Sequence, residues 1–441
     1  MRHDWRQMGA VALGREIAAG RVDPLTLAET FLEAIDNSNQ PIYARTTPRR
    51  ALAEARAAAD RARDGLRCGP LDGVPLSWKD LFDTAGCATE AGSRLLKGRV
   101  PGADAEVLRR ATLGGSVCLG KTHMSELAFS GLGLNPVTAT PPNIHRADLA
   151  PGGSSSGAAA SVAFGLAAAA VASDTGGSVR VPAAWNDLVG FKPAHGALPL
   201  TGVVPLCESF DTIGPIARSV ADAAAVHALL GGAAVDLRGA EDLHGRHLGV
   251  LTTVVTDDLD PQVAEAFEGA VQRLSEAGAQ IVEFDAPEVI HALDLAPILF
   301  ATEAYATWMD EIEDRPELMY DRVLDRFRGG AGYGGTDFIR AWQGLRRLRA
   351  EWTHRIAALD AVILPTTAIL PPPLAQLRAE PDFYDARNLM ALRNTRIANL
   401  MAGCALTLPT GQASCGVSLV MAGGCEGALL RLGAAVESVL C

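Results

Sequence analysis

Several features that would assign the protein to a familiar class are missing from its sequence. The formal net charge of the 441-residue chain is -12, so it lacks the excess of basic residues with which proteins bind nucleic acid or anionic membranes. The N-terminal segment also lacks the apolar core and the small-residue cleavage site of a secretion signal. We therefore expect a cytoplasmic protein with neither a nucleic-acid nor a membrane partner.

The cysteines and histidines lack the spacing of a metal site or a redox pair. None of the eight cysteines belongs to a CxxC motif, and the nine histidines are scattered along the chain. His244 and His247 form an HxxH pattern, but it lies in a polar, turn-like stretch without a third ligand nearby. We expect free thiols in a reducing compartment, no metal and no cofactor.

Long runs of large apolar residues are also missing. Two uncharged runs, residues 149–173 and 397–425, are long enough to span a membrane. The first consists mainly of alanine, glycine and serine, and the second is interrupted by Pro409 and several glycines. We interpret both runs as buried helix, strand and loop.

Apolar residues make up 48% of the chain, which is ample for a core, and their spacing alternates between helical and strand-like along the chain. Helical periodicity is found in residues 7–65 (with a break near 36–40), 104–113, 261–277 and most of 286–358. Strand-like segments are residues 71–81, 116–119, 248–255, 280–284 and 361–364. Residues 371–387 fit neither pattern, and we expect an irregular loop there. The alternation predicts the α/β class, with a mixed sheet that has helices on both faces.

Two generic motif matches lie in the first half of the chain. Residues 115–122 (GSVCLGKT) match the phosphate-binding pattern GxxxxGK[ST], but a helix precedes them and their middle is apolar and strand-like. Residues 153–157 (GSSSG) match GxSxG, with Ser155 as a candidate nucleophile, but Pro151 discourages the strand that a nucleophile elbow requires. We expect helix-turn-strand in the first segment and a loop leading into a helix in the second, whose start Ser155 and Ser156 would cap.

A set of ordered blocks closely resembles the amidase signature family. The blocks are GVPLSWKDLFDTAG at 73–86, GKTHMSE at 120–126, PGGSSSG at 151–157, ASDTGGSVRVPAA at 172–184, GFKP at 190–193 and FDTIGPIAR at 210–218. The resemblance is strong over residues 10–225 and weaker through residues 360–366 and 399–409. It implies one large domain over residues 1–441, with a signature core at about 70–225 and a helical, substrate-binding region at about 260–390.

The resemblance also implies a catalytic relay of three residues. Ser178 lies 24 positions after Ser154, which is the family's spacing for its two serines. By this resemblance Ser178 is the nucleophile, Ser154 passes the proton on and Lys79 is the base. A cis peptide bond at Ser154 is expected as well.

The chemistry of these residue types agrees with such a relay. A serine hydroxyl must lose its proton to attack an amide, and no histidine has a motif context that would make it the base. A lysine can act as the base if burial keeps it neutral, and Lys79 follows the apolar, strand-like segment 74–78. An ion pair with Asp80 is the alternative role for this lysine.

The glycine-rich loop 174–178 (DTGGS) has a function of its own in this interpretation. Its glycines allow several amide groups to point at one spot, which predicts an oxyanion hole formed by the backbone of Thr175, Gly176, Gly177 and Ser178. A simple glycine turn is the structural alternative. Asp174 and Arg180 are expected to brace the loop by hydrogen bonds.

The C-terminal part departs from the family. Where relatives commonly show a segment like LPVGLQ, this chain has GVSLVM at 416–421 and ends at Cys441. We therefore favour an amidase that acts on a small-molecule carboxamide as a monomer or homodimer. The alternative within the family is a glutaminase-type subunit of a tRNA-dependent amidotransferase, and an inactive scaffold is a remote one.

The sequence does not single out the substrate. Loops at 123–145 and the region 300–390 are expected to contact it. Aromatic residues that could line an apolar pocket, or equally pack in the core, are Trp308, Tyr320, Phe327, Tyr333, Trp342 and Tyr384.

Overall fold

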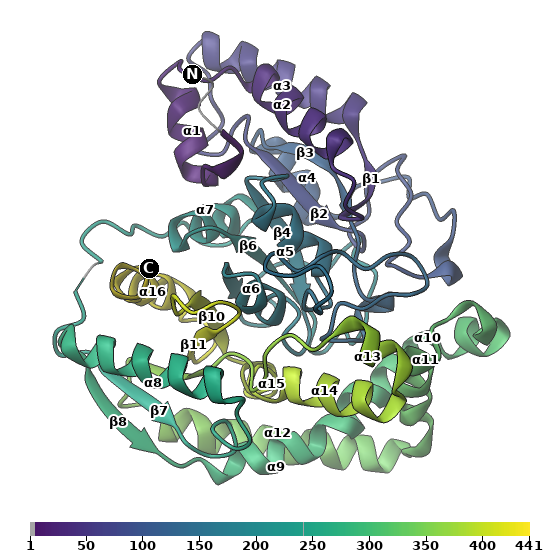
Figure 1. Ribbon diagram of the computed structural model, residues 1–441, viewed down its shortest axis with the longest axis vertical. Helices are drawn as coiled ribbons and strands as arrows, with labels where there is room; N and C mark the ends of the chain where they lie inside the picture. The colour runs from purple at the N-terminus through teal and green to yellow at the C-terminus, as the bar shows by residue number, and fades with distance from the viewer. Residues whose placement is uncertain (1–4, 241) are drawn as a thin grey trace.

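The computed structural model describes residues 5–240 and 242–441, which are built around a single 11-stranded sheet (Figure 1). The strands are β1 (Tyr43–Thr46), β2 (Pro75–Lys79), β3 (Val117–Thr122), β4 (Ala169–Asp174), β5 (Val189–Lys192), β6 (Thr212–Ala217), β7 (His247–Leu251), β8 (Gln280–Phe284), β9 (Ala361–Pro365), β10 (Cys404–Pro409) and β11 (Gly416–Met421). The predicted α/β class is confirmed.

The sheet is mixed, with the order β1-β3-β2-β4-β6-β5-β10-β11-β9-β7-β8. Strand β2 pairs parallel to both β3 and β4, and β7 pairs parallel to both β8 and β9. The remaining pairings are antiparallel. The parallel group around β2 is buried on every residue, as expected for strands that are covered on both faces.

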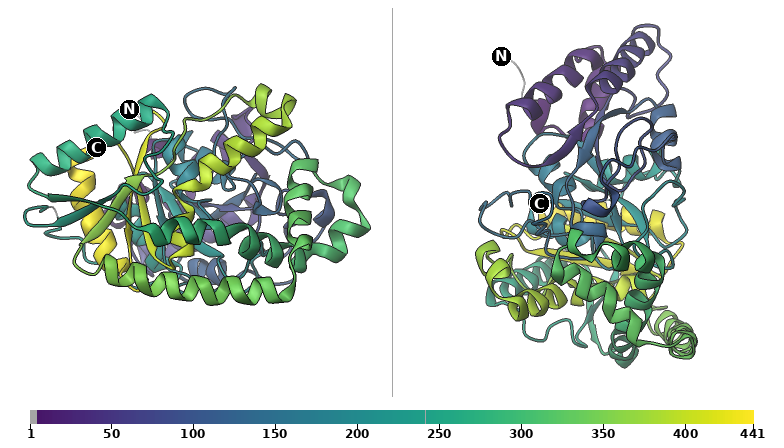
Figure 2. Two further views of the ribbon diagram at one scale, coloured as in Figure 1. Left: turned by 90° about the horizontal axis from the view of Figure 1, so that it is seen from below. Right: turned by 90° about the vertical axis from the view of Figure 1, so that its right-hand side faces the viewer.

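Helices flank this sheet on its two sides (Figure 2). The α-helices are α1 (Ala10–Ala18), α2 (Pro24–Asn37), α3 (Pro48–Arg63), α4 (Glu106–Leu113), α5 (Ser156–Ala163), α6 (Arg180–Trp185), α7 (Val220–Leu229), α8 (Pro261–Glu276), α9 (Pro287–Ala296), α10 (Thr302–Asp314), α11 (Asp321–Arg328), α12 (Gly335–Arg355), α13 (Leu374–Ala379), α14 (Pro381–Arg393), α15 (Arg396–Leu400) and α16 (Glu426–Leu440). Short 3-10 or π turns are η1 (Trp5–Gln7), η2 (Arg94–Leu96), η3 (Glu126–Ala128), η4 (Pro297–Ala301), η5 (Pro316–Leu318) and η6 (Gly329–Gly332).

The first three helices and α9 to α12 lie at opposite ends of the molecule (Figures 1 and 2). Local sequence explains where such helices begin. Helix α2 has Pro24 in its first turn, and Asp23 accepts a hydrogen bond from the Thr26 amide at 2.8 Å. Its buried residues Leu27, Phe31 and Ile35 follow helical spacing, so one face of the helix packs into the core.

Residues 371–387 are not the irregular loop that we expected. They form α13 and most of α14, and each helix begins directly after or at a proline. The prolines that suggested a loop are at helix starts, where the missing N–H group costs nothing. Leu374, Leu377 and Tyr384 are buried in a cluster under these helices, so tertiary packing supplies what the local pattern did not show.

The phosphate-loop pattern is a buried strand, as expected from its apolar middle. Residues 117–122 form β3, fully buried between β1 and β2. The Lys121 ammonium lies 3.2 Å from Asp80 and donates a hydrogen bond to Thr89 Oγ1 at 2.9 Å. A strand in this position has no loop with which to wrap a phosphate group.

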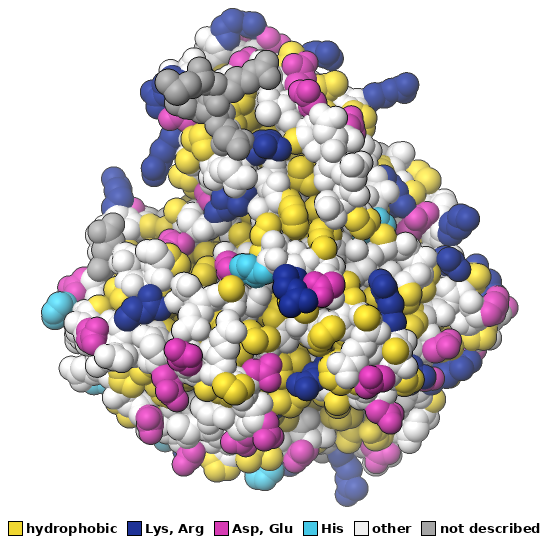
Figure 3. All heavy atoms as spheres, in the orientation of Figure 1, with side chains coloured by type: hydrophobic (Ala, Val, Ile, Leu, Met, Phe, Trp, Pro, Cys, Tyr) yellow, Lys and Arg dark blue, Asp and Glu magenta, His cyan; other side chains and the backbone are white. Residues whose placement is uncertain are grey.

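The two uncharged runs are divided among core elements, as we interpreted them: α5 and β4 in the first, β10 and β11 in the second. Within the described residues, one helical stretch, residues 287–314, is long and apolar enough to cross a membrane by length and composition alone. Part of that stretch lines the pocket described below. On the face shown in Figure 3, basic and acidic side chains are interspersed.

Candidate active site

Lys79 and Ser173 meet because β2 and β4 are parallel neighbours whose carboxyl ends lie at the same edge of the sheet. The Lys79 ammonium donates hydrogen bonds to Ser154 Oγ at 2.6 Å and to Ser173 Oγ at 2.8 Å. All three side chains are buried. The sequence pointed to Lys79 and Ser154 but not to Ser173, whose one signal was its position five residues before Ser178.

Lys79 is electrostatically unusual because it is buried and, among residues 5–240 and 242–441, no carboxylate is bonded to it. The alternative role, an ion pair with Asp80, is not found, since Asp80 pairs with Lys121 and Arg45 instead. Burial lowers the pKa of Lys79 to about 7, and the more distant negative charges of Asp174 and Asp211 only partly oppose that shift. A substantial fraction of this lysine is therefore neutral near pH 7.

Ser154 is held in a tightly packed loop. The Gly153–Ser154 peptide bond is cis, as the resemblance implied. A Cβ atom on Gly153 would lie 2.5 Å from the Gly133 amide nitrogen, so a larger residue does not fit there. The Gly153 N–H donates to the Gly131 carbonyl at 2.8 Å, and the Ser154 carbonyl accepts from the Ser125 N–H at 3.0 Å. These contacts fix the Ser154 hydroxyl against Lys79.

The next two serines do not cap α5 as we expected. Ser155 occupies the N-cap position, but its hydroxyl makes no cap bond and donates instead to the Ser173 carbonyl at 3.2 Å. Ser156 is already the first helical residue, and its buried hydroxyl has no hydrogen-bond partner within the described part of the chain. The side chain of Ser155 therefore faces β4 rather than the start of the helix.

Asp174 and Arg180 brace the loop that contains Ser178, as expected. Asp174 accepts hydrogen bonds from the amides of Gly177 (2.8 Å) and Val179 (3.1 Å) and from the Arg180 guanidinium (3.0 and 2.9 Å). Burial alone would raise the pKa of Asp174, but the charge and hydrogen bonds of Arg180 prevail and hold it at about 2. The loop is therefore shaped around a buried, ionised carboxylate.

Another buried carboxylate, Asp211, supports the other side of this loop. It accepts hydrogen bonds from the Thr175 hydroxyl and from the amides of Leu206 (3.0 Å) and Cys207 (3.2 Å). Burial raises the pKa of Asp211 to about 6. Asp211 belongs to the 210–218 block, which the sequence marked only as part of the resemblance.

The backbone amides of the loop differ in their availability. The Gly177 N–H is already donated to Asp174. Across residues 5–240 and 242–441, the N–H groups of Thr175, Gly176 and Ser178 donate no hydrogen bond. Three of the four amides that we predicted for an oxyanion hole are thus free to bind a ligand, while the fourth shapes the loop.

Ser178 lines a pocket of about 360 Å³. The pocket is lined by Ala128, Phe129, Ser130, Thr175, Gly176, Ser178, Leu206, Ala296, Pro297, Phe300, Ala301, Arg322, Asp325, Arg326, Gly329, Tyr333, Asp385, Asn388, Leu389, Leu392 and Arg396. Among the described residues, the Ser178 hydroxyl forms no hydrogen bond with Ser154 or any other side chain.

Most of the aromatic candidates pack around the pocket rather than line it. Of the six, Tyr333 lines it. Trp308 donates to the Pro205 carbonyl at 3.0 Å, and Trp342 stacks on Phe210. Phe327 packs against Phe129, Tyr384 donates to Ser130, and Tyr320 packs against Tyr384.

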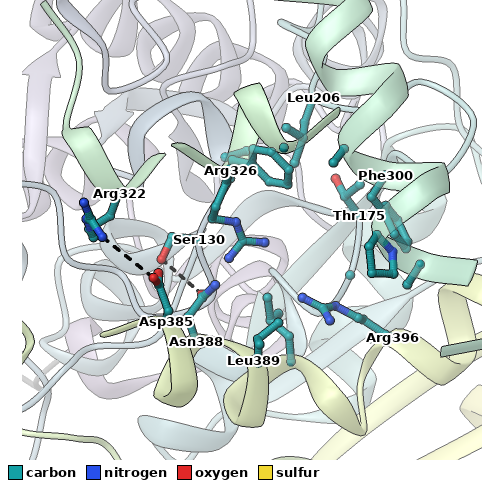
Figure 4. Close-up of a pocket in the computed structure, with 18 of the residues that line it drawn as sticks. Ser130, Thr175, Leu206, Phe300, Arg322, Arg326, Asp385, Asn388, Leu389 and Arg396 are labelled. Atoms are coloured by element: carbon teal, nitrogen blue, oxygen red, sulfur yellow. Dashed lines mark hydrogen bonds and ion pairs between the residues drawn. The ribbon is translucent and has the colours of Figure 1, made fainter. Parts of the chain in front are cut away.

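Polar residues that the sequence did not single out reach the pocket from α11, α14 and α15. Figure 4 shows Arg326 and Arg396 around its centre, and Arg322 at one side next to Asp385. Arg322 and Arg326 are four residues apart, so they share one face of a helix, and that spacing was the one signal available in the sequence. Arg396 comes from a separate helix more than 60 residues later, a contact that only the fold reveals.

Comparison with known proteins agrees with the geometry. The sequence model of the family described as Amidase matches residues 26–424. The 2-amino-5-chloromuconic acid deaminase of Comamonas testosteroni is 37% identical over 81% of this chain and 79% of that protein. A glutamyl-tRNA(Gln) amidotransferase chain of Chloroflexus aggregans is 31% identical over 96% of this chain and 94% of its own length.

Among solved structures, one described as an amidase superposes with a TM-score of 0.89 at 30% identity. It covers 98% of this chain, and all of its own length is matched. The family match and the common fold together show that the chain belongs to the amidase family, and is an enzyme that hydrolyses the C–N bond of amides.

Proposed function

We propose that the protein hydrolyses the carboxamide of a small molecule to a carboxylate and ammonia or an amine, through an acyl-enzyme on Ser178. The observation that carries this proposal is the buried Lys79. Its Nζ lies 2.6 Å from Ser154 Oγ, and no carboxylate in the described part of the chain is bonded to it. A lysine with no ion pair and a lowered pKa is suited to accept a proton rather than to hold a charge.

In the first half-reaction Ser178 Oγ attacks the amide carbonyl carbon. Its proton passes to Ser154 Oγ as the proton of Ser154 passes to the lone pair of neutral Lys79. The resulting tetrahedral intermediate collapses as the C–N bond breaks, and the departing nitrogen takes the proton back through the same residues. Ammonia or an amine leaves, and the acyl group remains on Ser178.

In the second half-reaction water replaces the amine. The relay removes a proton from water as its oxygen attacks the acyl carbon, and the proton returns to Ser178 when the ester bond breaks. The negative oxygen that forms in both halves is stabilised by the free amides of Thr175, Gly176 and Ser178. Rotation of the Ser178 hydroxyl towards Ser154 completes the relay when substrate is bound, since catalytic hydrogen bonds often tighten only in the complex.

Ser155 is not suited to be the nucleophile. It is fully buried, its hydroxyl is engaged by the Ser173 carbonyl, and it is not among the residues that line the pocket. The GxSxG alternative is therefore not favoured.

A screen of small amides for released ammonia or amine tests the proposal. We expect Ser178→Ala to lower kcat by about 10⁴-fold or more, because the covalent step is lost. Ser156→Ala is the matched control, since it removes a neighbouring buried hydroxyl that has no partner. A Ser178→Ala enzyme that keeps most of its turnover, with Ser155→Ala inactive, would reverse the assignment.

The similarity to amidotransferase chains supports a second candidate, a glutaminase that delivers ammonia to a partner. The pocket of about 360 Å³ accommodates glutamine as well as other small amides. Purification from its native host distinguishes the two candidates. A free amidase runs as a monomer or homodimer and turns over its substrate alone, whereas one chain of an amidotransferase co-purifies with partner chains and depends on them.

A further inference from the structure

Two arginines face each other across the pocket that contains Ser178. Arg326 comes from α11 and Arg396 from the first position of α15. In Figure 4 both guanidinium groups point into the open centre of the pocket, and Arg322 points away from it towards Asp385. Arg326 and Arg396 therefore present positive charge to whatever occupies the space next to Ser178.

Within the described residues neither guanidinium has a carboxylate at ion-pair distance, and the charge of Asp385 acts on Arg326 from farther away. Arg322 has carboxylate neighbours at 2.9 Å (Asp325) and 3.8 Å (Asp385). In the part of the chain that the structure describes, by contrast, Arg326 and Arg396 form no hydrogen bond and no ion pair. The contact recorded for Arg326 is with the ring of Phe129, at 4.5 Å from its centroid. Partly buried cations are normally paired, so this pair has an unmet need for an anion.

The pKa values of the two arginines also indicate that their charges are not fully compensated. Burial lowers the pKa of Arg396 to about 9, and the charge of Arg326 contributes to that shift. Burial also lowers the pKa of Arg326. Like charges close together in a poorly solvated site repel each other, and an anion placed between them would relieve the repulsion of both.

Arg396 is also fixed relative to the reacting centre. The hydroxyl of its neighbour Thr395 donates to the Gly176 carbonyl at 2.7 Å, and the Thr395 carbonyl accepts from Arg180 at 2.7 Å. A Cβ atom on Gly176 would lie 3.4 Å from Arg396 Cγ, so the side chain crosses directly over the loop of Ser178. The backbone from which Arg396 extends is therefore held next to the loop of Ser178.

We propose that Arg326 and Arg396 bind a carboxylate of the substrate, so that the preferred substrates are monoamides of small dicarboxylic acids. This inference rests on the proposed function for the amide end of the molecule. The planar guanidinium groups match a carboxylate in shape and in hydrogen-bond pattern. The short chain between the two ends lies against the apolar wall formed by Phe129, Phe300 and Leu392.

The first test compares two amides that differ only at the far end. Glutaramate, the monoamide of glutaric acid, carries a carboxylate there, and pentanamide carries a methyl group. We expect kcat/KM for glutaramate to exceed that for pentanamide by about 10- to 100-fold, because the charged hydrogen bonds are made only with the acid. Equal values, or a preference for pentanamide, would overturn the proposal.

Substitutions assign the effect to the two arginines. Arg326→Met and Arg396→Met should each remove most of the preference by lowering glutaramate turnover about 10- to 100-fold, with little change for pentanamide. Arg396→Lys keeps the positive charge and should retain part of the preference for glutaramate. Arg328→Met is the control, because Arg328 is on the same helix but outside the pocket and pairs with Glu313. A preference that survives both Met variants contradicts the assignment.

A binding measurement separates this inference from the proposed mechanism. Glutarate should bind to the Ser178→Ala protein in calorimetry, and Arg396→Met in the same background should weaken that binding about 10-fold or more. Binding without any amide turnover by the unmodified enzyme would keep the anion site and reject the proposed function. Turnover of neutral amides with no binding of glutarate would keep the proposed function and reject the anion site.

Discussion

Lys79 is the residue on which the proposed chemistry depends. Replacing it with Met keeps its length and apolar stem but removes the proton acceptor. We expect kcat/KM to fall by about 10² to 10⁴-fold, the usual contribution of a general base. The measurement is steady-state turnover, with the melting temperature as a check that the variant is folded. A folded Lys79→Met enzyme with near-normal turnover would contradict the relay.

The lowered pKa of Lys79 also predicts how activity depends on pH. The base must be neutral, and its pKa is about 7, so kcat/KM should rise roughly tenfold per pH unit below pH 7 and level off above it. The sign follows from burial, which favours the neutral amine. An ordinary lysine would instead require a pH above about 10. A profile that is flat between about pH 5.5 and 8 would show that this group does not control the reaction.

At the scale of elements, the loop between β4 and α6 depends on one buried ion pair. Asp174→Asn would leave Arg180 charged and without its carboxylate, and we expect a loss of about 3–5 kcal/mol in the free energy of unfolding. Chemical denaturation measures this loss. Asp236→Asn is the matched control, because Asp236 forms an exposed pair with Arg238 and its change should be too small to measure. Equal stability of the two variants would contradict the role given to Asp174.

The elements that line the pocket should affect substrate binding more than stability. Leu389 lies on α14, borders the pocket and is 54% exposed. We expect Leu389→Ala to lower kcat/KM for a substrate with an apolar chain by about 3- to 10-fold, through lost contact area, without a change in melting temperature. Ile339→Ala on α12, where Ile339 is 59% exposed, is the control and should change neither. An unchanged kcat/KM in Leu389→Ala would mean that substrate does not reach α14.

At the scale of the whole molecule, the sequence predicted best those parts of the structure that are formed by residues close together in the chain. The strands that contain residues 75–79 and 117–119 and the bracing pair of Asp174 and Arg180 could be predicted, because each depends on residues close in sequence or on the resemblance. Strand β4 was not among the predicted strands, since its alanines carry no strand pattern. The helices over 374–393 could not be predicted, since their prolines suggested a loop and their stabilising contacts are distant in the chain.

The pocket shows the same division between local and distant information. One part of its lining comes from Thr175, Gly176 and Ser178, in the loop that the sequence identified. Much of the rest comes from α9, η4, α11, α14 and α15. Arg326 and Arg396 approach each other only when these helices fold against the end of the sheet. A scan for aromatic residues therefore found Tyr333 but not the charged groups that distinguish this site.

The most direct test of the relay is covalent labelling of the intact protein with a fluorophosphonate probe, followed by mass spectrometry of the labelled peptide. The probe reacts with an activated serine and requires no knowledge of the substrate. We expect a label on Ser178 that is lost or forms much more slowly in Lys79→Ala and in Ser154→Ala and that is kept in Ser156→Ala. A label on Ser155, or a label on Ser178 that forms equally fast without Lys79, would contradict it.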